Sequence, residues 1–391
     1  MSVFDALVGQ DAVVTQLSDA AEAAAQAVAG GEGAGMTHAW LFTGPPGSGR
    51  SVAARAFAAA LQCPDRGCGH CSSCHQALSG THPDVAVVVP EGLHLSIADA
   101  RQVIGRSSRA PTRGRWQVTL IEDADRMEER TSNTLLKAVE EPPPHSVLLL
   151  CAPSADDLLP TIRSRCRLVP LRAPAAAAVA GVLVDRDGVD PELASFAARA
   201  AQGHIGRARR LATDEEARRE RQAVLALPRS IGNVGQALHA AKALVDAAKE
   251  EADLLAQGRD VVEREALSAA LGGGATGKGY TGGAPKGGAG ALKELEKRQR
   301  SRGTRTQRDA LDRALVDLAA FYRDVLALQL DAGAVPVHAD LADQATAIAR
   351  GSTPESTLHR IDAVLACRTA IDGNVAPLLA VEAMALALRT G

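Results

Sequence analysis

The sequence predicts an α/β domain built on a parallel sheet, followed by a region that is entirely helical. Two observations support the α/β domain. Short apolar runs of strand length alternate with segments of helical periodicity as far as residue 173, and a glycine-rich turn follows the first run. The helical region is predicted because no strand-like run follows Pro174. With 391 residues, the chain is long enough for roughly two to four domains.

Four short runs of aliphatic and β-branched residues are predicted as strands, at 39–43, 85–89, 116–121 and 147–151. Helices are predicted between them, the first at 51–61, directly after the glycine-rich turn. A second helix at 96–107 starts with Ser96 and Asp99 in the spacing of a capping box. A third, at 130–139, is ended by a run of prolines. Strands connected by helices indicate a parallel sheet that is covered on both faces.

The clearest helix of the second half is 308–330. Its apolar side chains recur at helical spacing and are expected on one face: Leu311, Leu315, Leu318, Phe321, Tyr322, Val325 and Leu328. Residues 272–290 contain ten glycines in nineteen positions, which predicts a flexible loop. Residues 297–308 contain six basic residues in twelve and are interpreted either as a solvated helix end or as a phosphate-contacting segment. The neighbouring Glu294 and Glu296 favour the solvated helix end.

The overall composition excludes several classes of protein. Lys plus Arg total 43 and Asp plus Glu total 46, so the net charge of −3 excludes a chain that is basic over its whole surface, although not a local basic patch. Aromatic residues are 2% and AVILMFWYC residues 46%, which is typical of packed helices. No membrane span is predicted, because no apolar run approaches about 18 residues. No secretory signal is predicted either, because the first residues, MSVFDALVGQ, show no basic stretch followed by an apolar one. We expect a cytoplasmic protein.

Four of the seven cysteines are crowded into twelve positions, which favours a metal site in a reducing compartment over a disulfide framework. The spacing C-x4-C-x2-C-x2-C lets four thiolates complete a tetrahedral zinc site without an open position, which predicts a structural role. An iron–sulfur cluster or free thiols are the alternatives. The candidate ligands are Cys63, Cys68, Cys71 and Cys74.

Residues 44–51 (GPPGSGRS) fit the phosphate-loop pattern G-x-x-x-x-G-K-[ST] at every position but one. Such a loop aims backbone N–H groups at phosphate oxygens, and its Ser or Thr holds Mg²⁺. The departure is Arg50, which is larger and planar where lysine is usual. A plain glycine-rich turn is the alternative. The candidate nucleotide-binding residues here are Gly44, Gly47, Ser48, Gly49, Arg50 and Ser51.

Two acids, Glu122 and Asp123, directly follow the predicted strand 116–121. In phosphate-loop ATPases the usual order is Asp then Glu, where Asp supports Mg²⁺ and Glu orients the attacking water. The order is reversed here and Asp123 has the shorter side chain, so these candidate nucleotide-site residues predict poor water activation.

Several segments resemble the AAA+ subunits of bacterial DNA polymerase III clamp loaders. Residues 135–143 (LLKAVEEPP) resemble their LLK-x-LEEPP segment, 162–166 (IRSRC) their Ser-Arg-Cys motif, and 4–10 (FDALVGQ) their N-terminal nucleotide-base box. The four clustered cysteines match their zinc insertion. The resemblance covers roughly the first 175 residues, and the helical remainder agrees only in pattern.

The resemblance implies an architecture and a set of partners. It implies an AAA+ nucleotide-binding-like domain at 1–173 with a zinc module at 63–74, a small helical lid at 174–225 and a helical oligomerisation collar at 226–391. The implied partners are the gamma/tau and delta clamp-loader subunits, and, through the assembled complex, the sliding clamp and primer-template DNA. Structural zinc is the implied cofactor, while binding of ATP or ADP with Mg²⁺ is left open.

The Ser-Arg-Cys motif implies that Arg165 is an arginine finger, which enters the ATP site of a neighbouring subunit. The alternative is a structural pair with a local carboxylate such as Asp157. Departures at Arg50, at the reversed acids and at Ala152, where ATPases place a polar sensor, favour a family member without ATPase activity of its own. An ATP-hydrolysing gamma/tau-type motor is the second hypothesis, and a zinc-dependent DNA-binding module is a weaker third.

Overall fold

The computed structural model describes residues 2–31, 33–95, 97–107, 109–271 and 288–390. Contacts divide the chain into two compact units. The first unit comprises Met1–Pro90 and His94–Thr213, and the second comprises Glu91–Leu93 and Asp214–Gly391. Within the described ranges, no helix combines the length and the apolar character that crossing a membrane requires.

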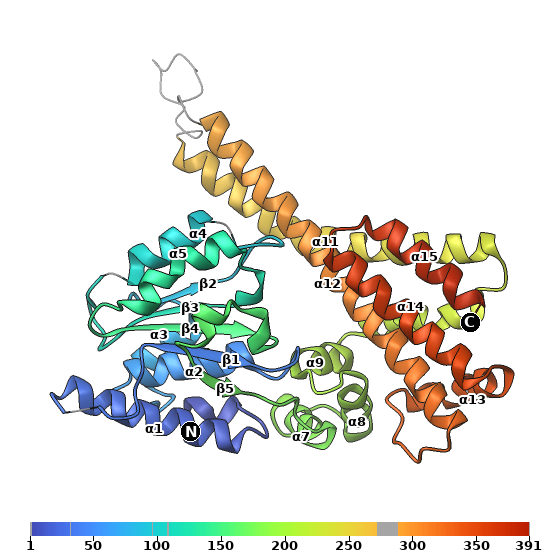
Figure 1. The fold of residues 1–391 in the computed structure, drawn as a ribbon, viewed down its shortest axis with the longest axis horizontal. Coiled ribbons are helices and arrows are strands. Elements are labelled where there is room, and N and C mark those ends of the chain that lie inside the picture. Colours follow the sequence, from blue (N-terminus) through green and yellow to red (C-terminus); the bar gives the residue numbers. More distant parts are fainter. Residues whose placement is uncertain (1, 32, 96, 108, 272–287, 391) are drawn as a thin grey trace. The chain divides into compact units, whose positions relative to one another are not determined.

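The first unit contains a five-stranded parallel sheet in the order β2-β3-β4-β1-β5 (Figure 1). Its strands are β1 Ala39–Thr43, β2 Val85–Val88, β3 Gln117–Ile121, β4 Ser146–Ala152 and β5 Arg167–Pro170. Every residue of β1, β3 and β4 is buried, as expected for parallel strands that are covered on both faces. The four predicted strands and the α/β fold class are therefore confirmed.

The edge strand β5 was not predicted. Only Val169 of its four residues is buried, and Pro170, which cannot donate a ladder hydrogen bond, is its last residue. Short edge strands of this kind carry no continuous apolar run, so their sequence does not distinguish them from a loop.

Helices cover both faces of the sheet (Figure 1). Trp40 and Phe42 pack with Phe57 in one core cluster, whereas Leu41 packs with Leu135 in the other, because successive strand residues point to opposite faces. The helical elements are η1 Val3–Ala6, α1 Asp11–Val28, α2 Arg50–Gln62, α3 Ser72–Ser79, α4 Ile97–Ser107, η2 Ala124–Arg126, α5 Glu129–Glu140, η3 Ala155–Asp157, α6 Pro160–Arg163, α7 Ala176–Asp187, α8 Pro191–Ala200 and α9 Ile205–Thr213. The predicted capping box of Ser96 and Asp99 lies outside the described side chains.

All regular elements among the described residues of the second unit are helices, which confirms the predicted all-α region. Its elements are α10 Glu215–Ser230, α11 Val234–Ala270, α12 Gly288–Gln329, η4 Ala339–Leu341, α13 Ala342–Gly351, α14 Pro354–Asp372 and α15 Pro377–Thr390. Helices α7 to α9 group with the first unit and α10 with the second. The division into a lid at 174–225 and a collar at 226–391 stays a prediction.

The predicted apolar face of α12 is confirmed except at its end. Leu311, Leu315, Leu318, Phe321, Tyr322 and Val325 are buried in the core of the second unit. The assignment of Leu328 to this face is wrong, since 51% of it is exposed. The row of contacts continues instead through Gln329, whose Nε2 donates to the Ser352 carbonyl oxygen at 2.8 Å.

Two further predictions concern segments of α11 and α12. Residues 272–287 of the predicted flexible loop lie outside the described residues, whereas its last residues, 288–290, belong to α12. The interpretation of 297–308 as a helix end is wrong, because the segment lies inside α12, where it packs along α11. The basic run therefore has one side against a helix and another side toward solvent.

Candidate functional site

The glycine-rich turn connects β1 to α2 and has the backbone of a phosphate loop. Gly44, Gly47 and Gly49 have φ values of +150°, +85° and +91°, which L-residues rarely adopt. A Cβ on Gly47 would lie 2.5 Å from the Cα of His204, just before α9, so only glycine fits there. No side chain caps α2 at Gly49, so its first N–H groups keep the geometry that binds an anion.

The basic residue of the loop is turned back onto the loop itself. Arg50 donates from Nη1 to the Gly44 carbonyl oxygen at 2.8 Å. Ser48 is buried and its Oγ has no hydrogen-bond partner among the described residues, while Ser51 lies half-buried in the first turn of α2. Gln10, in the segment that resembles a nucleotide-base box, donates to the Ser48 carbonyl oxygen at 3.3 Å and anchors the loop. The candidate loop residues are thus brought together, but with Arg50 engaged in an internal contact.

The acids at the end of β3 lie next to α2, and one of them is already paired. Arg55 donates from Nε and Nη2 to Glu122 Oε1 at 3.0 and 2.8 Å. Asp123 has a φ of +50° and lies 3.9 Å from Arg126 Nε. Burial, followed by the negative charge of Asp123, raises the pKa of Asp125.

Sequence reasoning missed Arg55. The only signal was its position one helical turn after Ser51, on the same face of α2. At the end of β4, where a polar sensor is expected in an ATPase, Cys151 is buried and Ala152 has no polar side chain. Burial raises the pKa of the Cys151 thiol well above its usual range, so this group stays a neutral thiol.

The four clustered cysteines lie together from the end of α2 to the first turn of α3. Their Sγ atoms are all within 4.8 Å of one another, and the Cys63 Sγ is 3.6 Å from that of Cys68 and 3.7 Å from that of Cys71. A tetrahedron with Zn–S bonds of about 2.3 Å has S–S edges of about 3.8 Å, so the residues fit a zinc ion. Four protein sulfurs leave no open position, which assigns such a site a structural role.

The environment of these sulfurs favours the thiolate at Cys63 but not at Cys71 or Cys74, because burial raises the pKa of those two thiols. Backbone N–H groups point at two of them, from Cys68 to Cys63 Sγ at 3.5 Å and from Cys74 to Cys71 Sγ at 3.4 Å. Although burial raises the pKa of Cys63, the backbone hydrogen bonds outweigh it and bring the pKa to about 7. Cys63 and Cys74 are also part of the core cluster that includes Val3 of η1. The cysteines therefore lie where η1, near the start of the chain, packs against α2.

Arg165 lies just after α6 and pairs locally. Its Nη2 is 3.0 Å from Glu140 Oε1, and its Nη1 donates to the Thr161 carbonyl oxygen at 2.9 Å. The side chain is 41% exposed. The alternative prediction expected a local carboxylate such as Asp157 as the partner of Arg165. The choice of Asp157 is wrong, because the partner is Glu140 and the Asp157 carboxylate accepts from the Ser154 backbone N–H at 2.7 Å. The pair with Glu140 joins the two segments, 135–143 and 162–166, that carry the resemblance.

Comparison with known proteins supports the same family. Residues 23–175 match the family model described as "DNA polymerase III, delta subunit". The DNA polymerase III subunit delta' of Pseudomonas aeruginosa is 37% identical over 147 residues, which cover 36% of this chain and 45% of that protein. The subunit delta' of Bacillus subtilis is 30% identical over 195 residues, which cover 49% of this chain and 59% of that protein. The resemblance of the N-terminal part to DNA polymerase III clamp-loader subunits is confirmed.

The same part of the chain also matches a second kind of subunit. The DNA polymerase III subunit gamma/tau of Mycobacterium tuberculosis is 33% identical over 174 residues, which cover 43% of this chain and 28% of that protein. The chain thus spans less than two thirds of the length of these relatives. Among solved structures, a gamma subunit-related protein from Thermotoga maritima aligns with 95% of this chain and 99% of its own at 15% identity, with a TM-score of 0.41.

Proposed function

We propose that this chain is a delta'-type subunit of a DNA polymerase III clamp loader, that it hydrolyses no ATP itself, and that it lends Arg165 to the ATP site of a neighbouring subunit. The observation that carries the proposal is the pair between Arg55 and Glu122, at 2.8 and 3.0 Å. A carboxylate held by a guanidinium is a poor ligand for Mg²⁺, which is the role of the first of the two acids in phosphate-loop ATPases and is needed for hydrolysis.

The other candidate catalytic positions agree with this assignment. Arg50 donates to the Gly44 carbonyl oxygen rather than extending as a free cation, and Ala152 offers no polar atom where a sensor is expected. The loop backbone keeps the form that accepts phosphate, so the proposal allows ATP or ADP to bind through Gly47, Gly49 and Ser51 without turnover. In this role the chain acts as a rigid stator beside the subunits that hydrolyse ATP.

Zinc, if bound by Cys63, Cys68, Cys71 and Cys74, supplies a crosslink and no chemistry. We propose that it stabilises the first unit. The proposed partners are gamma/tau and delta subunits, with the sliding clamp and primer-template DNA reached through the assembly, in the cytoplasm. The second candidate function is an ATP-hydrolysing gamma/tau-type motor, which the 33% identity to a gamma/tau subunit favours.

Steady-state ATP hydrolysis by the isolated chain separates the two functions. If the chain is a stator, neither the natural chain nor Arg50→Lys should release phosphate above the blank, because Glu122 stays paired with Arg55 in both. Turnover in the common enzyme range of about 1–10³ s⁻¹ would refute the stator and support the motor. Filter binding of labelled ATP in the same samples measures whether the loop holds nucleotide independently of hydrolysis.

A further inference from the structure

The second unit contains a basic surface that the proposed function does not use. Helices α11 and α12 lie side by side (Figure 1), and the basic run of residues 297–308 lies on α12. Its cations fall into two groups, those that face α11 and those that face solvent. The two groups differ in their partners, and this difference carries the inference.

The inward cation is neutralised within the structure. Arg302 is only 13% exposed, and its Nη2 lies 2.6 Å from Asp260 and 2.7 Å from Glu263. The hydrogen bond from Arg302 outweighs partial burial and lowers the pKa of Glu263 to about 2. Arg259 pairs with the same Glu263 at 2.8 Å and with Glu91 at 3.2 Å. The carboxylates of this part of α11 are therefore used to hold the two helices together.

In the described part of the chain, the cations that face solvent do not pair with carboxylates of α11. Lys293, which precedes the basic run by four residues, shares one face of α12 with Lys297 and Arg300 of the run, because the spacings are four and three residues. This face lies opposite Gln299 and Arg302. Lys293, Lys297 and Arg300 are exposed. Among the described residues, no carboxylate lies within ion-pair distance of either lysine, and Glu296 reaches Arg300 only at 4.0 Å.

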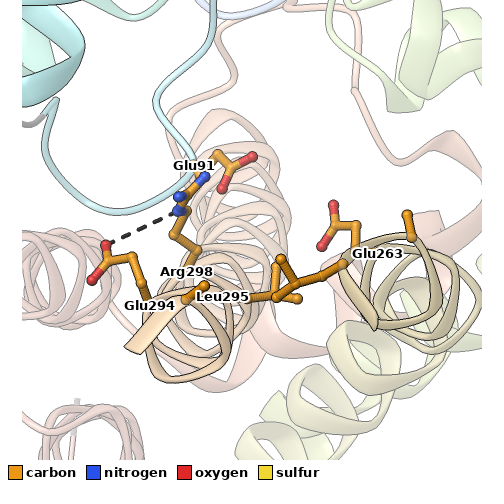
Figure 2. Close-up of a pocket in the computed structure, with 8 residues that line it drawn as sticks. Glu91, Glu263, Glu294, Leu295 and Arg298 are labelled. Atoms are coloured by element: carbon orange, nitrogen blue, oxygen red, sulfur yellow. Dashed lines mark ion pairs between the residues drawn. The ribbon is translucent and has the colours of Figure 1, made fainter. Parts of the chain in front are cut away.

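The nearby Glu294 does not neutralise this face either. Glu294 pairs with Arg298 along α12 at 4.0 Å, while Glu263 lies on the other helix (Figure 2). Of the acids beside the basic run, one is thus directed to Arg298 and the other only weakly to Arg300. The row formed by Lys293, Lys297 and Arg300, which we call the outer basic row, keeps a net positive charge although the whole chain has a net charge of −3.

We infer that the outer basic row binds the phosphate backbone of duplex DNA. It extends about 10 Å at about 1.5 Å per residue, a length over which a duplex presents about six negative charges. No aromatic residue occurs between 288 and 320, so the face offers no platform for stacking the bases of a single strand. Leu292, beside Lys293, is 42% exposed but lies on a neighbouring face of α12, so the row itself has no apolar anchor of the kind that protein interfaces use. Backbone contact without sequence preference needs only such mobile cations.

The test measures binding of the full chain to a fluorescein-labelled 30-base-pair duplex by anisotropy, in 50 to 200 mM salt. Three phosphate contacts predict a slope of log affinity against log salt of about −2.7, which is a loss of about 40-fold over this range. The triple variant K293A/K297A/R300A is expected to lose at least about 10-fold in affinity at 50 mM salt and most of the slope. Its circular dichroism should be unchanged, because all three side chains are exposed.

The matched control is R219A/K242A/K249A, which removes the same charge from exposed positions elsewhere in the second unit. It should bind the duplex as the natural chain does. Equal losses in both triple variants would overturn the inference, as would tighter binding of a single strand of the same length. Displacement of the duplex by poly-L-glutamate at equal charge concentration would assign the face to an acidic protein and equally overturn it.

Discussion

Replacing Arg165 by alanine separates a finger that acts on a neighbour from a local structural arginine. In the isolated chain its pair with Glu140 is exposed, since the two side chains are 41% and 46% accessible. Exposed ion pairs contribute at most about 1 kcal/mol, so R165A should lower the melting temperature of the first unit by no more than about 4 °C. A finger, in contrast, is worth about 10³–10⁵ in rate at the site that it enters.

Arg163 provides a closely matched control. It is 42% exposed and pairs with Asp156, so R163A removes the same side chain and a similar ion pair two residues away. The assay is ATP hydrolysis and clamp loading by the reconstituted assembly, stimulated by the clamp and primed DNA. R165A should stop hydrolysis at the one ATP site that Arg165 enters, so the total hydrolysis rate should fall by the share that this site contributes. The rate of clamp loading should fall further. Equal, small effects of the two variants would refute the finger and leave Arg165 with its structural pair.

Three further predictions concern the cysteine cluster, a buried histidine of the second unit and the pair between Arg55 and Glu122. Metal analysis should find about one zinc per chain, and Cys71→Ser should lose the metal and lower the melting temperature of the first unit; a metal-free chain with unchanged stability would contradict this. Burial, followed by the charge of Arg221, lowers the pKa of His338, whose Nδ1 lies 2.6 Å from Arg221 Nη2. Because the unfolded chain then takes up the proton first, the second unit should lose stability as pH falls below about 6.5, and thermal unfolding of His338→Gln should show a smaller loss. Replacing Arg55 by alanine leaves Glu122, 16% exposed, without its partner and should cost about 1.5–3 kcal/mol in chemical denaturation, whereas an unchanged midpoint would show that the pair is weak.

The features that the sequence indicates most directly depend on patterns within a few residues. The strands β1, β3 and β4 are buried on both faces. Such burial selects apolar residues at successive positions, so these strands can be recognised in the sequence as short apolar runs. The cysteine cluster is likewise local, since twelve residues contain all four sulfurs. The glycines of the phosphate loop signal their backbone conformation because other residues rarely adopt it.

What only the tertiary structure decided is which charged groups meet. Arg55 and Glu122 are 67 positions apart in the chain, and Arg302 and Asp260 are 42 apart. The first pair forms because the parallel sheet places the end of β3 beside α2, and the second because α11 and α12 pack against each other. The sequence by itself determined the fold class, the cysteine cluster and the loop, because these depend on local spacing. The pairing of each arginine depends on how distant elements pack, and so does the division of the basic run into an inward and an outward face.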